Sequence, residues 1–173
     1  GLKEKDLIGI PWMLAFALRA DGWYLRQDII WHKPNPMPES VKDRCTKSHE
    51  YLFLLSKNKK YYYDNEAIKE PVKQDWGTRD RTSGKYHNPG TGLQPHSGLT
   101  KSYDRKNKRS VWSITNKPYK GAHFAVFPPE LIEPCILAGS QEGDIILDPF
   151  MGSGTTGMVA KKHFRSYIGC ELH

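Results

Sequence analysis

The stretch of sequence that most constrains the fold runs from residue 144 to residue 171 and reads DIILDPFMGSGTTGMVAKKHFRSYIGCE. The apolar run at residues 145–147 is typical of a buried parallel strand, and it ends at Asp148. Gly152 and Gly154 then permit a tight turn, because a residue without a Cβ lets the backbone turn sharply and approach a ligand. The pattern therefore predicts a strand that runs directly into a glycine turn.

The second half of this stretch predicts a helix and another strand. Thr155 and Thr156 are residue types that cap helices, and we expect them to cap one that continues to Lys162. A further apolar run at residues 167–170 ends in Glu171. A carboxylate at the carboxyl end of a strand can accept both hydroxyls of a ribose. The stretch thus has the pattern of a βαβ unit with a site for a nucleoside cofactor.

Glycine spacing alone leaves several interpretations open. Gly152, Gly154 and Gly157 also fit the G-x-G-x-x-G fingerprint of nicotinamide-dependent oxidoreductases, with Glu171 near the expected distance of about 20 residues. A turn whose glycines serve only packing has the same spacing. The residues around the glycines must separate these alternatives.

Those neighbouring residues resemble motif I of the DNA amino-methyltransferases, which bind S-adenosylmethionine (SAM). The resemblance rests on the Asp-Pro-Phe that precedes the first glycine, and Glu171 matches the acid of motif II. The residues that this resemblance assigns to the cofactor pocket are Asp148, Pro149, Phe150, Gly152, Ser153, Gly154, Thr155 and Glu171.

Upstream of this stretch, residues 123–131 (HFAVFPPEL) resemble motif X of the same enzymes. In that family the segment packs beside motif I and closes over the methionine end of the cofactor. Phe127 and Pro128 are the contacts that the resemblance implies. The two prolines at 128 and 129 suit the entrance of a helix, which we expect to end near Gly139.

Nearer the start, residues 25–31 predict a strand that leads into a loop with three prolines in five positions, and residues 49–57 predict another strand. Rigid loops fed by a strand often hold functional side chains. The run from residue 9 to residue 57 is closely similar to motifs V to VIII of bacterial and phage DNA methyltransferases. The resemblance implies an active-site rim made of Trp31, Lys33, Pro34 and Asn35.

The order of the motifs, with V to VIII first and X, I and II last, resembles the permuted β class. That class implies a Rossmann-like, doubly wound, mostly parallel sheet and methylation of an exocyclic amine, either N6 of adenine or N4 of cytosine. A cytosine-C5 enzyme would need a cysteine nucleophile, and Cys45, Cys135 and Cys170 are not placed for that role. Their spacing predicts no metal site, and three cysteines in 173 residues indicate reduced thiols in a cytoplasmic protein. The resemblance implies the cytoplasm of a bacterial or phage-infected cell.

The catalytic tetrapeptide of the family, Asp or Ser followed by Pro-Pro and an aromatic residue, does not occur in this sequence. In the family it follows a strand in the middle of the sheet, which we expect between the motif I strand and the strand at residues 25–31. A buried parallel sheet cannot leave such a slot empty without unpaired backbone groups. We therefore expect a fragment that is completed by a missing N-terminal segment, a second chain or a homodimer partner.

Between the two motif blocks, the middle of the chain is polar and basic. From residue 101 to 120 there are seven Lys or Arg against one acid, within a chain of 173 residues and net charge +7. Such a cluster favours a polyanion, although a solvated loop is the common alternative. The resemblance implies three segments: a catalytic-side half at 1–69, a target recognition insertion at 70–119 and a SAM-binding half at 120–173. The candidate contacts with double-stranded DNA are Arg79, Arg81, Lys85, Arg105, Lys106, Lys108 and Arg109.

The amino-acid composition narrows the classes of protein to which this chain can belong. Hydrophobic residues make up 38% of the chain and charged residues 26%, and no apolar run is long enough to cross a membrane. The leading hypothesis is a site-specific DNA methyltransferase fragment of a restriction-modification type. A non-catalytic DNA-binding or partner subunit with the same fold and a nicotinamide-dependent oxidoreductase are the alternatives.

Overall fold

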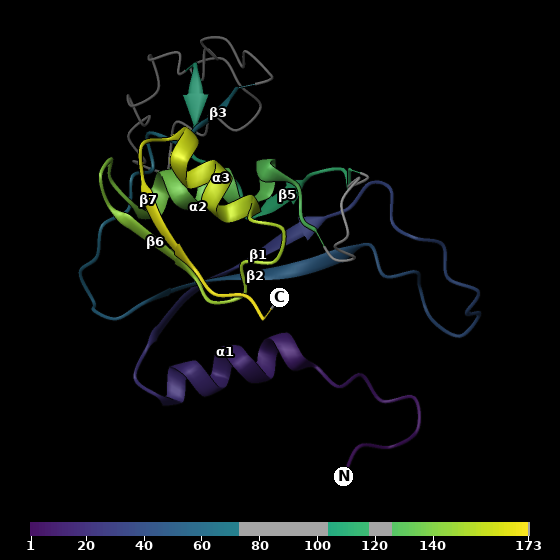
Figure 1. Ribbon diagram of the computed structural model, residues 1–173. Coiled ribbons are helices and arrows are strands. Elements are labelled where there is room, and N and C mark those ends of the chain that lie inside the picture. Colours follow the sequence, from purple (N-terminus) through teal and green to yellow (C-terminus); the bar gives the residue numbers. More distant parts are fainter. Residues whose placement is uncertain (73–103, 118–125, 173) are drawn as a thin grey trace, which may run out of the picture. The chain divides into compact units, whose positions relative to one another are not determined.

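The computed structural model describes residues 1–72, 104–117 and 126–172 of the protein (Figure 1). The chain divides into two compact units, one made of residues 1–68 with 109–173 and the other of residues 69–108. In the second unit, β3 (Glu70–Pro71) pairs antiparallel with β4 (Arg105–Lys106). No helix within the described ranges is long and apolar enough to span a bilayer.

One sheet of the first unit contains both parallel and antiparallel strands. Its central strand is β1 (Tyr24–His32), which pairs antiparallel with β2 (His49–Ser56) and parallel with β5 (Val111–Ser113). The strands expected at residues 25–31 and 49–57 are confirmed as β1 and β2. Trp31 and Trp112 stand side by side in the parallel register, and with Leu131 they form a buried cluster.

Helix α1 (Ile10–Ala20) packs on this sheet through aromatic contacts. The ring of Trp12 lies 5.2 Å from Tyr51 and 5.1 Å from Phe53, in edge-to-face geometries that favour such pairs. This helix was not among the elements predicted from the sequence. Its apolar residues surround the axis, so that one face reaches the sheet while Met13 and Leu14 remain exposed.

The cofactor-side half consists of α2 (Pro129–Gly139), β6 (Ile145–Asp148), α3 (Thr155–Lys162) and β7 (Ser166–Gly169). β6 and β7 are parallel, and α3 contacts both strands, which confirms the predicted βαβ unit (Figure 1). The helix expected to begin at the two prolines is confirmed as α2. Ile136, Val159 and Ala160 are buried between α2 and α3.

The carboxylate of Glu133 links α2 to the end of α3. Glu133 Oε1 lies 2.8 Å from Lys162 Nζ and 2.7 Å from His163 Nε2. These hydrogen bonds, with that of Lys162 the larger influence, hold the pKa of Glu133 below its usual value. The carboxylate is thus charged at neutral pH and links α2 to the carboxyl end of α3.

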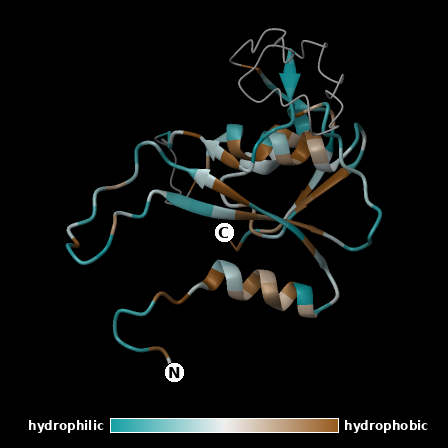
Figure 2. Ribbon diagram, turned by 180° about the vertical axis from the view of Figure 1, so that it is seen from behind, coloured by the Kyte–Doolittle hydropathy of each residue, from teal (hydrophilic) through white to brown (hydrophobic). Residues whose placement is uncertain are grey.

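The described strands form three separate sheets rather than one doubly wound sheet. Within those residues, β6 pairs only with β7, and β2 pairs only with β1. Ile145 and Leu147 of β6 are each 64% exposed, although both are strongly apolar, and the apolar character of the strand and of α1 is visible in Figure 2. β1 is paired on both edges, so the slot expected between β6 and β1 does not border β1, and the missing strand stays a prediction. Among the described strands of this unit, β2, β5, β6 and β7 each have one unpaired edge.

Close packing of α3 on β7 depends on Gly157, and this predicts a measurable loss of stability. A Cβ at this position would lie 2.8 Å from ring carbons of Tyr167, whereas a Cβ on Gly139 would meet nothing within 4 Å. We expect Gly157→Ala to lower the free energy of unfolding by about 1–2 kcal/mol, because overpacking displaces the ring. Gly139→Ala, the matched control, should be neutral or stabilising by up to about 1 kcal/mol. Urea denaturation measures both.

A double-mutant cycle tests the cause of that loss. In a Tyr167→Ala background the added methyl group has room, so Gly157→Ala should no longer destabilise the protein. An equal loss in both backgrounds would show that the ring is not the obstacle.

Candidate cofactor site

Two acids flank the glycine turn at the carboxyl ends of β6 and β7. Asp148 is the last residue of β6 and pairs in register with Gly169, and Glu171 follows two residues later. Ligands of open α/β sheets bind at this edge of parallel strands. Both Asp148 and Glu171 are therefore at the end of the βαβ unit where a cofactor is expected.

Both glycines of the turn need the left-handed region of backbone space. The φ angle is 53° at Gly152 and 82° at Gly154. The backbone N–H of Gly152 donates to Glu171 Oε2 at 2.6 Å, and Leu172 N–H donates to the other carboxylate oxygen at 2.9 Å. A Cβ on Gly154 would meet no atom within 4 Å, so the space beside the turn is open. This arrangement fits a ligand that approaches the backbone closely.

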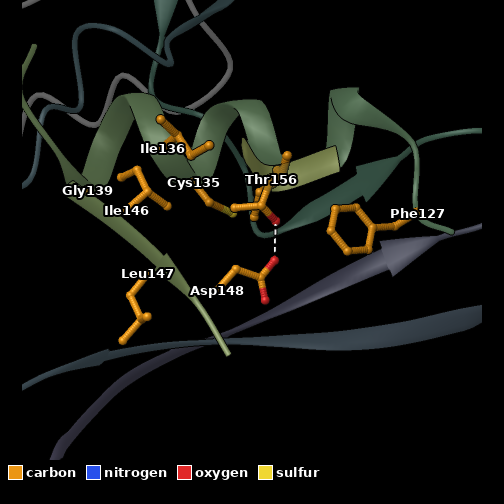
Figure 3. Close-up of a pocket in the computed structure, with 9 residues that line it drawn as sticks. Phe127, Cys135, Ile136, Gly139, Ile146, Leu147, Asp148 and Thr156 are labelled. Atoms are coloured by element: carbon orange, nitrogen blue, oxygen red, sulfur yellow. Dashed lines mark hydrogen bonds between the residues drawn. The ribbon is translucent and has the colours of Figure 1, made fainter. Parts of the chain in front are cut away.

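The carboxylate of Asp148 is held from two sides. The backbone N–H of Phe150 donates to Oδ1 at 3.0 Å, and the hydroxyl of Thr156 donates to Oδ2 at 2.5 Å (Figure 3). The expectation that Thr155 and Thr156 cap α3 is wrong. Gly154 is the N-cap residue and no side chain caps the helix, because the Thr156 hydroxyl is directed back to the end of β6.

A pocket of about 420 Å³ lies beside these groups, a size typical of small-molecule sites (Figure 3). Its lining is mostly apolar, with Asp148 as the one charged residue, and β6 and α2 supply most of it. The lining residues are Phe127, Ile132, Cys135, Ile136, Gly139, Ile146, Leu147, Asp148 and Thr156. The polar end of the pocket therefore belongs to the candidate cofactor site, while the apolar remainder is formed mainly by β6 and α2.

The expected cofactor residues divide into two groups in the structure. Phe127 lines the pocket with Asp148, and Pro128 is buried as the N-cap residue of α2. Phe150 is 87% exposed and does not line the pocket, and Pro149 is exposed as well. The hydroxyls of Ser153 and Thr155 form a 3.1 Å hydrogen bond with each other inside the turn.

The face of α2 that lines the pocket was not predicted from the sequence. Ile132, Cys135, Ile136 and Gly139 lie there at spacings of three, four and seven residues, which is the repeat of one helix face. That spacing is a signal which the sequence does contain. The contact between Thr156 and Asp148 has no such signal, because it joins a helix to the strand before it through side chains.

Three of the four residues assigned to an active-site rim, Trp31, Lys33 and Asn35, have contacts within the protein. Trp31 is only 4% exposed, and its indole N–H donates to the carbonyl of Ile114 at 2.8 Å. The ammonium group of Lys33 pairs with Glu50 and lies 4.3 Å from the centre of the Trp31 ring. Trp31 therefore lies in the buried cluster with Trp112 and Leu131.

Asn35, in contrast, joins the proline-rich loop to the segment after β5. Its side-chain amide donates to the carbonyl of Asn116 at 3.2 Å and accepts from the backbone N–H of the same residue at 3.0 Å. Pro34 beside it is exposed. These contacts extend the parallel pairing of β1 and β5 beyond the strand ends.

Of the candidate DNA contacts, four lie in the described ranges. Arg105 and Lys106 form β4, and Lys108 and Arg109 follow it. The guanidinium of Arg105 donates to the carbonyl of Lys69 at 2.8 Å. Arg79, Arg81 and Lys85 lie outside the described residues. The compact unit at residues 69–108 overlaps the insertion expected at 70–119, whereas β5 belongs to the other unit.

The glycine turn, the two acids and the parallel strands define an α/β protein with a site for a nucleoside-type cofactor. A family model described as DNA methylase, that of the N6 and N4 methyltransferases, matches residues 4–173. The chain therefore belongs to the N6/N4 DNA methylase family, as the sequence motifs indicate. This membership favours a methyltransferase over the nicotinamide-dependent alternative.

Named relatives agree with this assignment. The chain is 53% identical over 173 residues to the type II methyltransferase M.Cfr9I of Citrobacter freundii, covering 100% of this chain and 48% of that protein. It is also 53% identical to the type II methyltransferase M.SmaI of Serratia marcescens, covering 100% of this chain and 50% of that protein. The chain thus spans about half the length of the curated relatives that it matches.

Solved structures show the same fold. The PvuII DNA methyltransferase, described as cytosine-N4-specific, matches with a TM-score of 0.66 at 19% identity, over 100% of this chain and 56% of that one. The complex of M1.HpyAVI with SAM matches with a TM-score of 0.62 at 24% identity, over 97% of this chain and 66% of that one. At these identities the likeness concerns the fold alone.

Proposed function

We propose that this chain is the SAM-binding part of a site-specific DNA methyltransferase that modifies an exocyclic base amine. The observation that carries the proposal is the pair of acids around the glycine turn. Asp148 and Glu171 stand at the carboxyl edge of two parallel strands, and Gly152 N–H donates to Glu171 at 2.6 Å. The membership of the chain in the DNA methylase family supports the same function.

Different residues of the site bind different parts of the cofactor. The carboxylate of Glu171 accepts hydrogen bonds from the two ribose hydroxyls of the cofactor. Asp148, at the end of the pocket, accepts from a second polar group of the cofactor. Phe127 and the aliphatic face of α2 supply apolar contact and exclude water. When bound, SAM supplies an electrophilic methyl group on its sulfonium, and these residues hold it for direct transfer.

The target amine must reach this site from a duplex. An exocyclic amine is inaccessible in stacked DNA, so we expect the nucleotide to flip out of the helix. Groups that accept the hydrogens of the amine would leave its lone pair free to attack the methyl group. We assign these groups to the Pro-Pro-aromatic tetrapeptide of the family, on a strand next to β6 that this sequence does not contain. The unpaired edge of β6 and the half-length match to relatives support this assignment.

Double-stranded DNA is the proposed partner, and the basic residues near β4 are the proposed contact with its phosphates. The type II relatives support a restriction-modification role in the bacterial cytoplasm. The target amine is N6 of adenine or N4 of cytosine.

Cofactor binding is the direct test of this proposal. We expect the protein to bind SAM in a calorimetric titration, and Glu171→Ala to weaken binding about 10- to 100-fold, because two hydroxyls lose a charged acceptor. Glu142→Ala is the matched control, since this exposed acid precedes β6 and lies away from the turn, and its affinity should be unchanged. A wild-type protein that binds no SAM would refute the proposed function.

A further inference from the structure

Thr156 makes a contact that its place in the sequence does not explain. The residue is 4% exposed in the first turn of α3, and its hydroxyl donates to Asp148 Oδ2 at 2.5 Å rather than capping the helix (Figure 3). A buried hydroxyl in a helix ordinarily bonds to its own backbone or to water. Here it reaches a carboxylate eight residues earlier, at the end of the preceding strand.

The contact fixes the direction of the Asp148 carboxylate. The N–H of Phe150 holds one oxygen at 3.0 Å, and Thr156 holds the other, so the carboxylate cannot rotate without breaking a hydrogen bond. Each carboxylate oxygen has about two acceptor positions, and these contacts use one on each. The remaining positions are available to a ligand in the pocket that Asp148 lines.

The apolar surroundings of Asp148 favour a particular kind of ligand group at its carboxylate. The other residues that line the pocket are apolar or uncharged, so Asp148 is its only negative charge. A carboxylate in such surroundings binds a cation or strong donor more tightly than it would in water. Among the parts of SAM, the ammonium of the amino-acid end best meets this requirement, because the ribose already has Glu171 as its acceptor.

We propose that Thr156 is a positioning residue that orients the Asp148 carboxylate toward the ammonium group of the cofactor. The inference rests on the proposed SAM-binding function and adds a role for Thr156, which lines the pocket and whose hydroxyl donates to Asp148. Asp148 receives the cation, and Thr156 and Phe150 N–H hold Asp148 in the direction that this contact requires.

Two ligands that differ in the amino-acid end test whether Thr156 acts through the ammonium group of the cofactor. S-adenosylhomocysteine carries the amino-acid end, and methylthioadenosine lacks it but keeps the adenosine. We expect Thr156→Val, which is nearly isosteric, to weaken S-adenosylhomocysteine binding about 10-fold and to leave methylthioadenosine binding unchanged. Thr156→Ser keeps a hydroxyl and should restore binding to within about 3-fold of the wild type. Calorimetric titration of each variant gives these affinities.

The outcomes distinguish this inference from the proposed function. Equal losses for both ligands would overturn it, because a merely structural threonine would disturb the whole site. Unchanged binding of S-adenosylhomocysteine by Thr156→Val would overturn it as well, while leaving cofactor binding by the wild type intact. If the wild type bound neither ligand, the proposed function itself would fail.

Discussion

Purified alone, the chain is expected to bind SAM but to transfer almost no methyl groups to DNA. The rate should rise by at least about 10²- to 10³-fold when a strand with the catalytic tetrapeptide is supplied beside β6, because preorganised acceptors contribute that much to transition-state stabilisation. The edge of β6 has no partner among the described strands, and its apolar residues Ile145 and Leu147 are exposed. A parallel strand would pair with this edge and cover the apolar side of the pocket.

The supplied half can come from a relative. M.SmaI is 53% identical over the 50% of its length that this chain matches, so its unmatched part should dock on a closely similar surface. We would produce the two polypeptides together and follow transfer of a tritiated methyl group to unmethylated genomic DNA. Mass spectrometry of the nucleosides would then distinguish N6-methyladenine from N4-methylcytosine. The added half alone, and the complex with Glu171→Ala, are the controls, and both should show little transfer.

Two results would change the interpretation. Full activity of the chain alone would place the catalytic group among its own residues and would refute the assignment to an external strand. A stable complex that binds SAM but transfers nothing would favour the non-catalytic subunit with the same fold.

The sequence predicted the elements whose signals are local. The β6–α3–β7 unit follows from an apolar strand, a glycine turn and a helix within 28 residues, and the observed bounds agree closely with the prediction. The helix α2 could also be predicted from the sequence, because two prolines mark its start. In these cases the residues that specify an element lie within the element itself or next to it.

Features that depend on distant pairing could not be predicted in this way. β5 has only three residues, within a segment whose basic character indicated a loop, and its partner β1 lies about 80 positions earlier in the sequence. Because β5 pairs with β1, Trp31 is buried in a cluster with Trp112 of β5. The contact of Thr156 with Asp148 likewise depends on how α3 packs against the end of β6.

Arg165 is expected to be one of the most important polar residues for stability, and Arg165→Met should lower the free energy of unfolding by about 2–4 kcal/mol. Its guanidinium donates to the carbonyl of Ser140 at 2.7 Å and to that of His163 at 2.6 Å, and these residues are the C-caps of α2 and α3. A third hydrogen bond of 3.2 Å reaches the hydroxyl of Ser140. One side chain thus satisfies the carbonyl ends of two helices, where a positive charge also complements the helix dipoles.

Thermal denaturation gives a direct measurement, with an expected decrease in melting temperature of roughly 5–15 °C for a chain of this size. Arg165→Lys should recover only part of the loss, because an ammonium lacks the planar fork that reaches both carbonyls together. Lys161→Met is the matched control, since it removes an exposed charge from the last turn of α3 and should change stability by less than about 0.5 kcal/mol. If Arg165→Lys were as stable as the wild type, charge alone would account for the effect. The bridge between α2 and α3 would then not depend on guanidinium geometry.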